Sequence, residues 1–138
     1  MTLALSPETG TMTQLLQGSP WEAGAYRRAL ALKDLPGDWD RPQSQRPTIE
    51  AINGALRYIE QVAGLEFFVI DAPFIAPLSN GGVQLEWDRG QRQLEIEVLP
   101  DGSAQFLISD AGEIREGALN APTSPSVKAL LGWLAASP

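Results

Sequence analysis

Three glutamates in a stretch of alternating sequence are the side chains best suited to acid–base chemistry. Glu86, Glu95 and Glu97 alternate with apolar residues, which predicts that they project from one face of an antiparallel sheet, with Glu95 diagonal to Glu86. Two carboxyl groups held about 5–9 Å apart could hydrolyse a glycoside. A solvated sheet face explains the same alternation. We favour it because a chain of 138 residues offers little material for an enclosed sugar cleft.

A second acidic group surrounds a tryptophan in a proline-rich segment. Asp38 and Asp40 flank Trp39, and Asp34 is close in the sequence. A calcium-binding loop needs regularly spaced oxygen ligands and a closing bidentate glutamate, which this segment lacks. We therefore predict a loop whose aspartates accept hydrogen bonds from turn amides. Trp39 is predicted to plug the edge of the core, with an aromatic anchor for a partner protein as the alternative.

The sequence contains no cysteine and no histidine. Their absence excludes disulfides, thiolate nucleophiles, histidine-based triads and the commonest ligand of transition metals. Gly81-Gly82 does not continue into the motif of a phosphate-binding loop. We therefore predict that the chain is not an enzyme, and we expect no cofactor and no metal.

The formal net charge is −7, from 17 acidic and 10 basic residues. Phosphate backbones and anionic membranes repel such a chain, so direct nucleic-acid binding is disfavoured unless arginines of the first half cluster locally. These arginines are Arg27, Arg28, Arg41, Arg46 and Arg57. No apolar run is long enough to span a membrane. Residues 1–6 lack the features of a secretory signal, so we expect a cytoplasmic protein.

The region from Gly81 to Leu119 predicts an antiparallel meander, because apolar residues recur at every second position between short turns. Residues 114–119 form its predicted edge strand. The predicted turns are Arg89-Gly90, Pro100-Asp101-Gly102 and Asp110-Ala111-Gly112.

The predicted turns also imply a register. A tight turn at Arg89-Gly90 places Leu85 opposite Leu94. The Pro-Asp-Gly turn fits a type I turn closed by a glycine bulge, and it places Ile96 opposite Phe106. In this register the apolar residues of three strands share one face.

Two amphipathic segments before the meander predict helices. The first begins at Ser19-Pro20, where Glu22 could complete a capping box, and ends at Pro36-Gly37. The second is capped by Thr48 and ends at Gly64 in a left-handed conformation. Its predicted apolar face consists of Ile49, Ile52, Leu56, Ile59 and Ala63.

A final helix is predicted after Ser124-Pro125. Leucines at helical spacing give it an apolar stripe, and Trp133 lies off the centre of that stripe. We expect Trp133 to cover the rim of the sheet, or alternatively to be exposed for a partner. Before the meander, residues 67–70 resemble a buried strand, and Pro73 and Pro77 predict an edge strand or an extended connection after it.

Together these elements predict an α+β fold. We expect an antiparallel meander of about four strands, with two N-terminal helices and one C-terminal helix packed on one face. Residues 1–18 are predicted to be an N-terminal arm or tail, and residues 19–138 a single domain.

The chain resembles a loosely defined group of small uncharacterised bacterial proteins across residues 30–119. The shared features are a Trp-Asp loop, a helix and a Gly-Gly-to-Trp meander: Leu35-Pro36-Gly37-Asp38-Trp39-Asp40, Pro47-Thr48-Ile49-Glu50-Ala51-Ile52, Gly81-Gly82-Val83-Gln84-Leu85-Glu86-Trp87 and Leu94-Glu95-Ile96-Glu97-Val98 with Pro100-Asp101-Gly102. In the group the loop is usually Asn-Trp-Asp-Gly-Tyr-Gly-like, whereas Arg41-Pro42 follows it here. The resemblance implies the fold and a bacterial origin, and it implies no activity.

The leading functional hypothesis is a non-catalytic, acidic protein-binding domain, such as an antitoxin-like, inhibitory or accessory subunit that occludes or stabilises a basic protein partner. The alternative is a small-molecule or glycan-binding module in which Trp87 or Trp39 stacks on the ligand. A hydrolase that uses carboxylates alone is the third hypothesis. The candidate partner-binding residues are Trp39, Asp38, Asp40, Glu86, Glu95, Glu97 and Trp133. The sequence does not define an oligomeric state.

Overall fold

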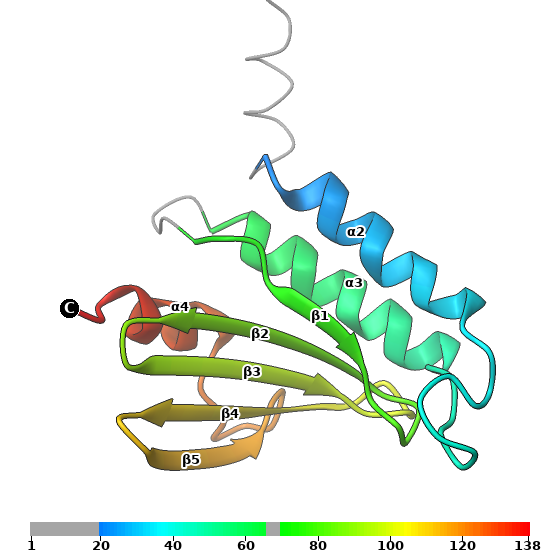
Figure 1. Cartoon of the computed structure of the whole chain (residues 1–138). Helices are drawn as coiled ribbons and strands as arrows, with labels where there is room; N and C mark the ends of the chain where they lie inside the picture. The colour runs from blue at the N-terminus through cyan, green and yellow to red at the C-terminus, as the bar shows by residue number, and fades with distance from the viewer. Residues whose placement is uncertain (1–19, 66–69) are drawn as a thin grey trace, which may run out of the picture.

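Helices pack on one face of an antiparallel sheet. The structure is a computed structural model that describes residues 20–65 and 70–138 (Figure 1). Among the described residues, helices α2 (Glu22–Ala31) and α3 (Ile49–Ala63) precede the sheet, and α4 (Val127–Ala135) follows it. A short 3-10 turn, η1 (Leu32–Asp34), extends α2. The predicted α+β class and antiparallel meander are confirmed.

The sheet has five described strands, so the prediction of about four is wrong. They are β1 (Phe74–Pro77), β2 (Val83–Arg89), β3 (Arg92–Val98), β4 (Ala104–Asp110) and β5 (Glu113–Ala118). Each strand pairs with the next in the sequence, in the order β1-β2-β3-β4-β5 (Figure 1). The additional strand is β1, which the prolines restricted to an edge position but did not prevent from pairing with β2.

The first hairpin has a different register from the predicted one. Arg89 pairs with Arg92, so the turn residues are Gly90 and Gln91, and Leu85 lies opposite Ile96 rather than Leu94. Gly90 has a φ of 60°, and a glycine at the first loop position suits a tight hairpin turn. The shift is two residues, which keeps every side chain on its predicted face.

The second hairpin has the predicted register. Val98 pairs with Ala104, and Ile96 pairs with Phe106. Gly102 has a φ of 90°, as the predicted glycine bulge requires. The following turn at Ala111 and Gly112 joins β4 to β5, which confirms the predicted edge strand.

The helix ends differ from their sequence signals in several details. Thr48 caps α3 by accepting a hydrogen bond from the Ala51 amide at 3.0 Å, as predicted. Gly64 has a φ of −81°, so the predicted left-handed end is wrong. Ser126 caps α4 in place of Ser124, because the Ser124 hydroxyl accepts from the Ala121 amide in the preceding turn.

Three predicted features fall wholly or partly outside the described residues, and the first is the N-terminal arm or tail at residues 1–18, which lies wholly outside them. The proposed capping box of the first helix depends on Ser19, and the proposed buried strand covers residues 67–70, of which only Ile70 is described. The first described helix has Trp21 at its N-cap position, without a side-chain cap.

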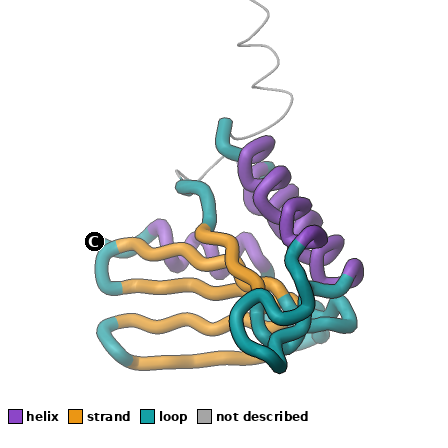
Figure 2. Tube along the Cα trace, turned by 45° about the vertical axis from the view of Figure 1, so that its right-hand side comes forward, coloured by secondary structure: helices purple, strands orange, loops and turns teal. Residues whose placement is uncertain are grey.

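The core lies between the sheet and helices α3 and α4. Leu85, Leu94 and Ile96 from the sheet are fully buried against Ile59 of α3 and Leu131 of α4. Figure 2 shows these helices on one side of the strands. We call the covered side of the sheet the helix-side face and the other side the open face.

Helix α3 approaches the sheet closely at Gly54. A Cβ atom placed on Gly54 would lie 2.6 Å from Cγ1 of Val98 and 3.4 Å from the carbonyl oxygen of Gly102. Glycine is therefore required at position 54, because a larger residue would clash with the side chain of Val98 on β3. Ile49, which the helical spacing places on the buried face, is 60% exposed because it is the first residue of the helix.

Candidate functional site

The open face of the sheet carries charge of one sign. Alternation along β2–β5 places its ionisable side chains on this face, and all of them are carboxylates. The arginines of the same strands, Arg89, Arg92 and Arg115, fall on the helix-side face by the same alternation. The open-face carboxylates are Glu86, Asp88, Glu95, Glu97 and Glu116.

Glu86 and Glu95 lie directly opposite each other, so the predicted diagonal arrangement is wrong. The Glu86 carboxylate accepts two hydrogen bonds of 2.9 Å, from the side-chain amides of Gln84 and Gln93. Glu97 accepts one of 2.8 Å from the amide of Gln105. The glutamines of this face therefore solvate two of its three predicted carboxylates.

Glu95 differs from its two neighbours. Within the described part of the chain, no hydrogen bond or ion pair reaches its carboxylate. Burial raises the pKa of Glu95, and the negative charges of Glu86, Glu97 and Asp88 raise it further. The central strand thus holds a carboxyl group in a position that disfavours its negatively charged form.

Apolar side chains adjoin these carboxylates on the open face. Leu107 pairs with Glu95 across β3–β4 and is half-buried. Phe74 pairs with Glu86 and is 66% exposed, and Ile114 on β5 is 61% exposed. The open face therefore combines one sign of charge with exposed apolar groups.

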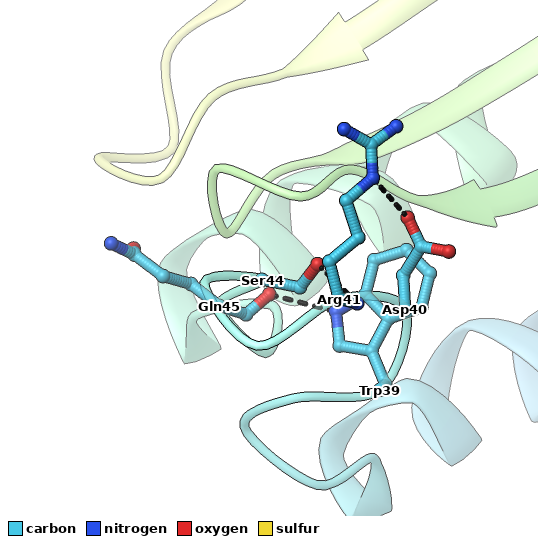
Figure 3. Close-up of polar contacts among 5 residues, drawn as sticks. All are labelled: Trp39, Asp40, Arg41, Ser44 and Gln45. Atoms are coloured by element: carbon cyan, nitrogen blue, oxygen red, sulfur yellow. Dashed lines mark hydrogen bonds and ion pairs between the residues drawn. The ribbon is translucent and has the colours of Figure 1, made fainter.

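The tryptophan loop is closed by its own hydrogen bonds (Figure 3). The indole N–H of Trp39 donates to the carbonyl oxygen of Gln45 at 2.9 Å, and the Arg41 amide donates to the Ser44 hydroxyl at 3.0 Å. Asp40 forms an ion pair with Arg41 at 3.4 Å. Trp39 is not among the half-buried side chains that pack against the core, so it closes the loop rather than the core edge.

The loop offers little for metal chemistry. Asp38 is exposed, and Asp40 is paired with Arg41. The described residues contain no group of three or more acidic side chains arranged to hold a metal ion. The Gln45 amide donates to the Ser79 carbonyl at 2.9 Å, which fixes the loop to the turn between β1 and β2.

Trp133 lies on the helix-side face, away from the three glutamates. Arg92 stacks 4.8 Å from the centre of its ring and forms an ion pair with Asp110 at 3.1 Å. The ring packs on the core, as expected for a residue that covers the rim. It also lines a groove of about 400 Å³ between α4 and strands β4 and β5.

The structure therefore distributes the predicted site residues over three places. Glu86, Glu95 and Glu97 share the open face, Asp38, Trp39 and Asp40 lie in the loop, and Trp133 lies beside α4. Asp88, Glu116, Leu107 and Ile114 were not among the predicted site residues, although alternation along each strand places them on the open face.

Comparison with known protein families, with curated proteins and with solved structures finds no match. Among the described residues, no helix has the length and hydropathy needed to cross a bilayer.

Proposed function

We propose that this chain is a non-catalytic protein-binding domain whose open face docks on a basic surface of a partner protein. In this role it acts as an antitoxin-like, inhibitory or accessory subunit in the cytoplasm. The observation that carries the proposal is the single sign of charge on the open face, where every ionisable side chain of β2–β5 is a carboxylate. Such a face steers a basic partner toward the sheet and repels acidic ones.

Glu95 supplies the strongest local reason for a cationic partner. Its carboxylate has no described partner in the chain, and burial and three nearby carboxylates raise its pKa. A lysine or arginine placed over Glu95 would offset the repulsion among these carboxylates. Because Leu107 and Glu86 flank Glu95, a partner with an apolar residue beside its cation would match the surface.

A charge-matched pair of variants tests this proposal. The first is the triple variant E86Q/E95Q/E97Q on the open face, and the control is D34N/E50Q/E60Q on η1 and α3, which makes the same change in net charge. At low salt, the wild type and the control should retain a basic protein in stoichiometric amount from extracts of the source organism. The open-face variant should lose it. Equal retention by both variants would overturn the proposal, as would the absence of any stoichiometric partner of the wild type.

A small-molecule or glycan-binding function is the second candidate, and the groove beside Trp133 is the observation that favours it. Trp87 is unsuited to stacking on a ligand, because it is 4% exposed and its indole N–H donates to the carbonyl oxygen of Asp71. In this reading a metabolite would raise the thermal stability of the wild type and have no effect on Trp133→Ala.

A further inference from the structure

One edge of the sheet is open to strand pairing. β5 ends the strand order, and no described residue pairs with its outer side. The Leu119 amide donates to the Ala104 carbonyl across β4–β5, so the alternation of the ladder directs the amides of Ile114 and Glu116 away from β4. The carbonyl of Ala118 already accepts from the Ser124 hydroxyl, which limits the open stretch to residues 113–117.

The opposite edge is less suitable for pairing. β1 contains Pro77, which lacks an amide proton, and helix α2 packs beside this strand. All residues of β5 except Gly117 are exposed. β5 is therefore the edge that a partner segment can reach.

A groove lies next to this edge on the helix-side face. Phe106 and Ile108 of β4 form one wall, and Leu130 and Trp133 of α4 form the other. Arg115 and Glu116 of β5 also line the groove at its outer edge. A Cβ atom on Gly117 would lie 3.1 Å from the Phe106 ring, so the ring covers the position where β5 has no side chain. A side chain entering from the edge opposite Gly117 would meet this ring directly.

We propose that an extended segment of a partner protein, in which apolar and basic residues alternate, adds to β5 as a sixth strand. Its apolar side chains point into the groove between β4–β5 and α4, and its basic side chains lie on the open face beside Glu116. Backbone hydrogen bonds to Ile114 and Glu116 provide affinity. The groove on the helix-side face selects the apolar side chains of the segment, and the carboxylate on the open face selects its basic side chains. This inference rests on the proposed function, since it specifies how the basic partner binds.

Charge favours a basic partner over a second copy of this chain. With the helix-side faces aligned, two copies of β5 can pair along residues 113–117 or 114–118. The first register places Arg115 opposite Arg115, and the second places Glu116 opposite Glu116. Like charges directly opposite each other destabilise a strand pair. A basic segment instead meets Glu116 on the open face.

Amide hydrogen exchange on the wild-type protein tests strand addition directly. The probe is a capped peptide of alternating lysine and leucine, and the control is a peptide of the same composition with all lysines before all leucines. The alternating peptide should slow exchange at the amides of Ile114 and Glu116, which face outward. The amides of Arg115 and Gly117, which face β4, serve as internal controls and should change little. Unchanged exchange at Ile114 and Glu116 under saturating peptide would overturn the inference.

Two variants of Glu116 separate the backbone contribution from the charge. Glu116→Pro removes an outward amide and should weaken peptide binding by at least about tenfold, whereas Glu116→Gln keeps the amide and should weaken it less. Equal binding by the wild type and Glu116→Pro, together with loss in E86Q/E95Q/E97Q, would refute strand addition and leave the proposed function intact. A dimer of the peptide-free protein that Glu116→Pro dissociates would identify a second copy as the occupant and overturn the inference.

Discussion

The two faces of this sheet arise from the same alternating sequence, and they have opposite physical character. On the helix-side face, Leu85 and Ile96 lie opposite each other and are completely buried by α3 and α4. In the adjacent pair, Glu86 and Glu95 lie opposite each other on a face that no described helix covers. The first pair stabilises the fold by burial of apolar surface, and the second pair opposes it by repulsion.

We therefore assign stability to the helix-side face and the proposed partner recognition to the open face. A solvated face would be served as well by mixed charges, which are usual on soluble proteins. The open face instead concentrates carboxylates, while the arginines of the same strands lie on the helix-side face, where Arg92 pairs with Asp110 and stacks on Trp133. The segregation of charge between the two faces is what the proposed partner surface explains.

The largest expected effect comes from truncating the same residue type on each face. Ile96→Ala removes a fully buried side chain and should lower the free energy of unfolding by about 2–5 kcal/mol. Ile114→Ala truncates an open-face residue that is 61% exposed, so it should change stability by at most about 0.5 kcal/mol. Urea unfolding of both variants measures the difference. Similar losses in the two would mean that the faces are not distinct in packing.

A smaller effect tests how closely the helices sit on the helix-side face. Gly54→Ala adds a methyl group 2.6 Å from Val98 and should destabilise the fold by about 1–3 kcal/mol, despite the better helix propensity of alanine. Part of this loss should disappear in the double variant G54A/V98A, in which space is restored. Gly24→Ala on α2 is the control. Its new methyl group meets only the flexible ends of Arg28 at 3.5 Å and Arg27 at 3.9 Å, so stability should stay the same or rise.

A loss of stability in the double variant equal to the sum of the losses in G54A and V98A would contradict this expectation. That result would show that the contact between residues 54 and 98 does not determine the distance between α3 and β3. Thermal unfolding of the three variants and the wild type completes the cycle.

Much of the fold could be predicted from alternation and turn chemistry, and the errors have definable causes. A register shift of two residues leaves every side chain on its face, so hydrophobic pattern alone did not distinguish Leu85 opposite Leu94 from Leu85 opposite Ile96. The second hairpin was predicted correctly because Gly102 fixes the position of its bulge. Similarly, two serines precede α4, and only the structure shows that Ser124 is engaged in the previous turn.

The candidate site was less predictable than the fold. The sequence indicated an acidic face at Glu86, Glu95 and Glu97, but it did not indicate which carboxylates would be solvated by glutamine amides. That depends on cross-strand neighbours, which follow from the register. Trp39 illustrates the same limit, because its hydrogen bond to Gln45 is a property of the loop conformation. The groove at β5 arises from residues of β4, β5 and α4, which only the tertiary structure brings together.

The smallest expected effect is the change in stability when Glu95 is replaced. The raised pKa of Glu95 determines the direction of this change and its dependence on pH. Because burial and neighbouring carboxylates raise the pKa of Glu95 in the folded state, the folded protein binds this proton more tightly than the unfolded chain. Ionised Glu95 therefore lowers stability above its raised pKa. Replacing it by glutamine should raise the free energy of unfolding at neutral pH by at most about 1 kcal/mol, the usual range for cross-strand pairs.

This gain should shrink as the pH falls through the raised pKa and should vanish below the ordinary glutamate value of 4.5, where both states are protonated. High salt should also reduce it, because the repulsion is screened. Glu97→Gln is the matched control, since it relieves only the repulsion between Glu97 and Glu95 and alters a hydrogen bond from Gln105, so its gain should be smaller. Denaturant unfolding across this pH range measures both variants. A destabilised Glu95→Gln, or a gain that persists at acidic pH, would show that Glu95 is accommodated within the chain, and the open face would then lose its strongest reason for a cationic partner.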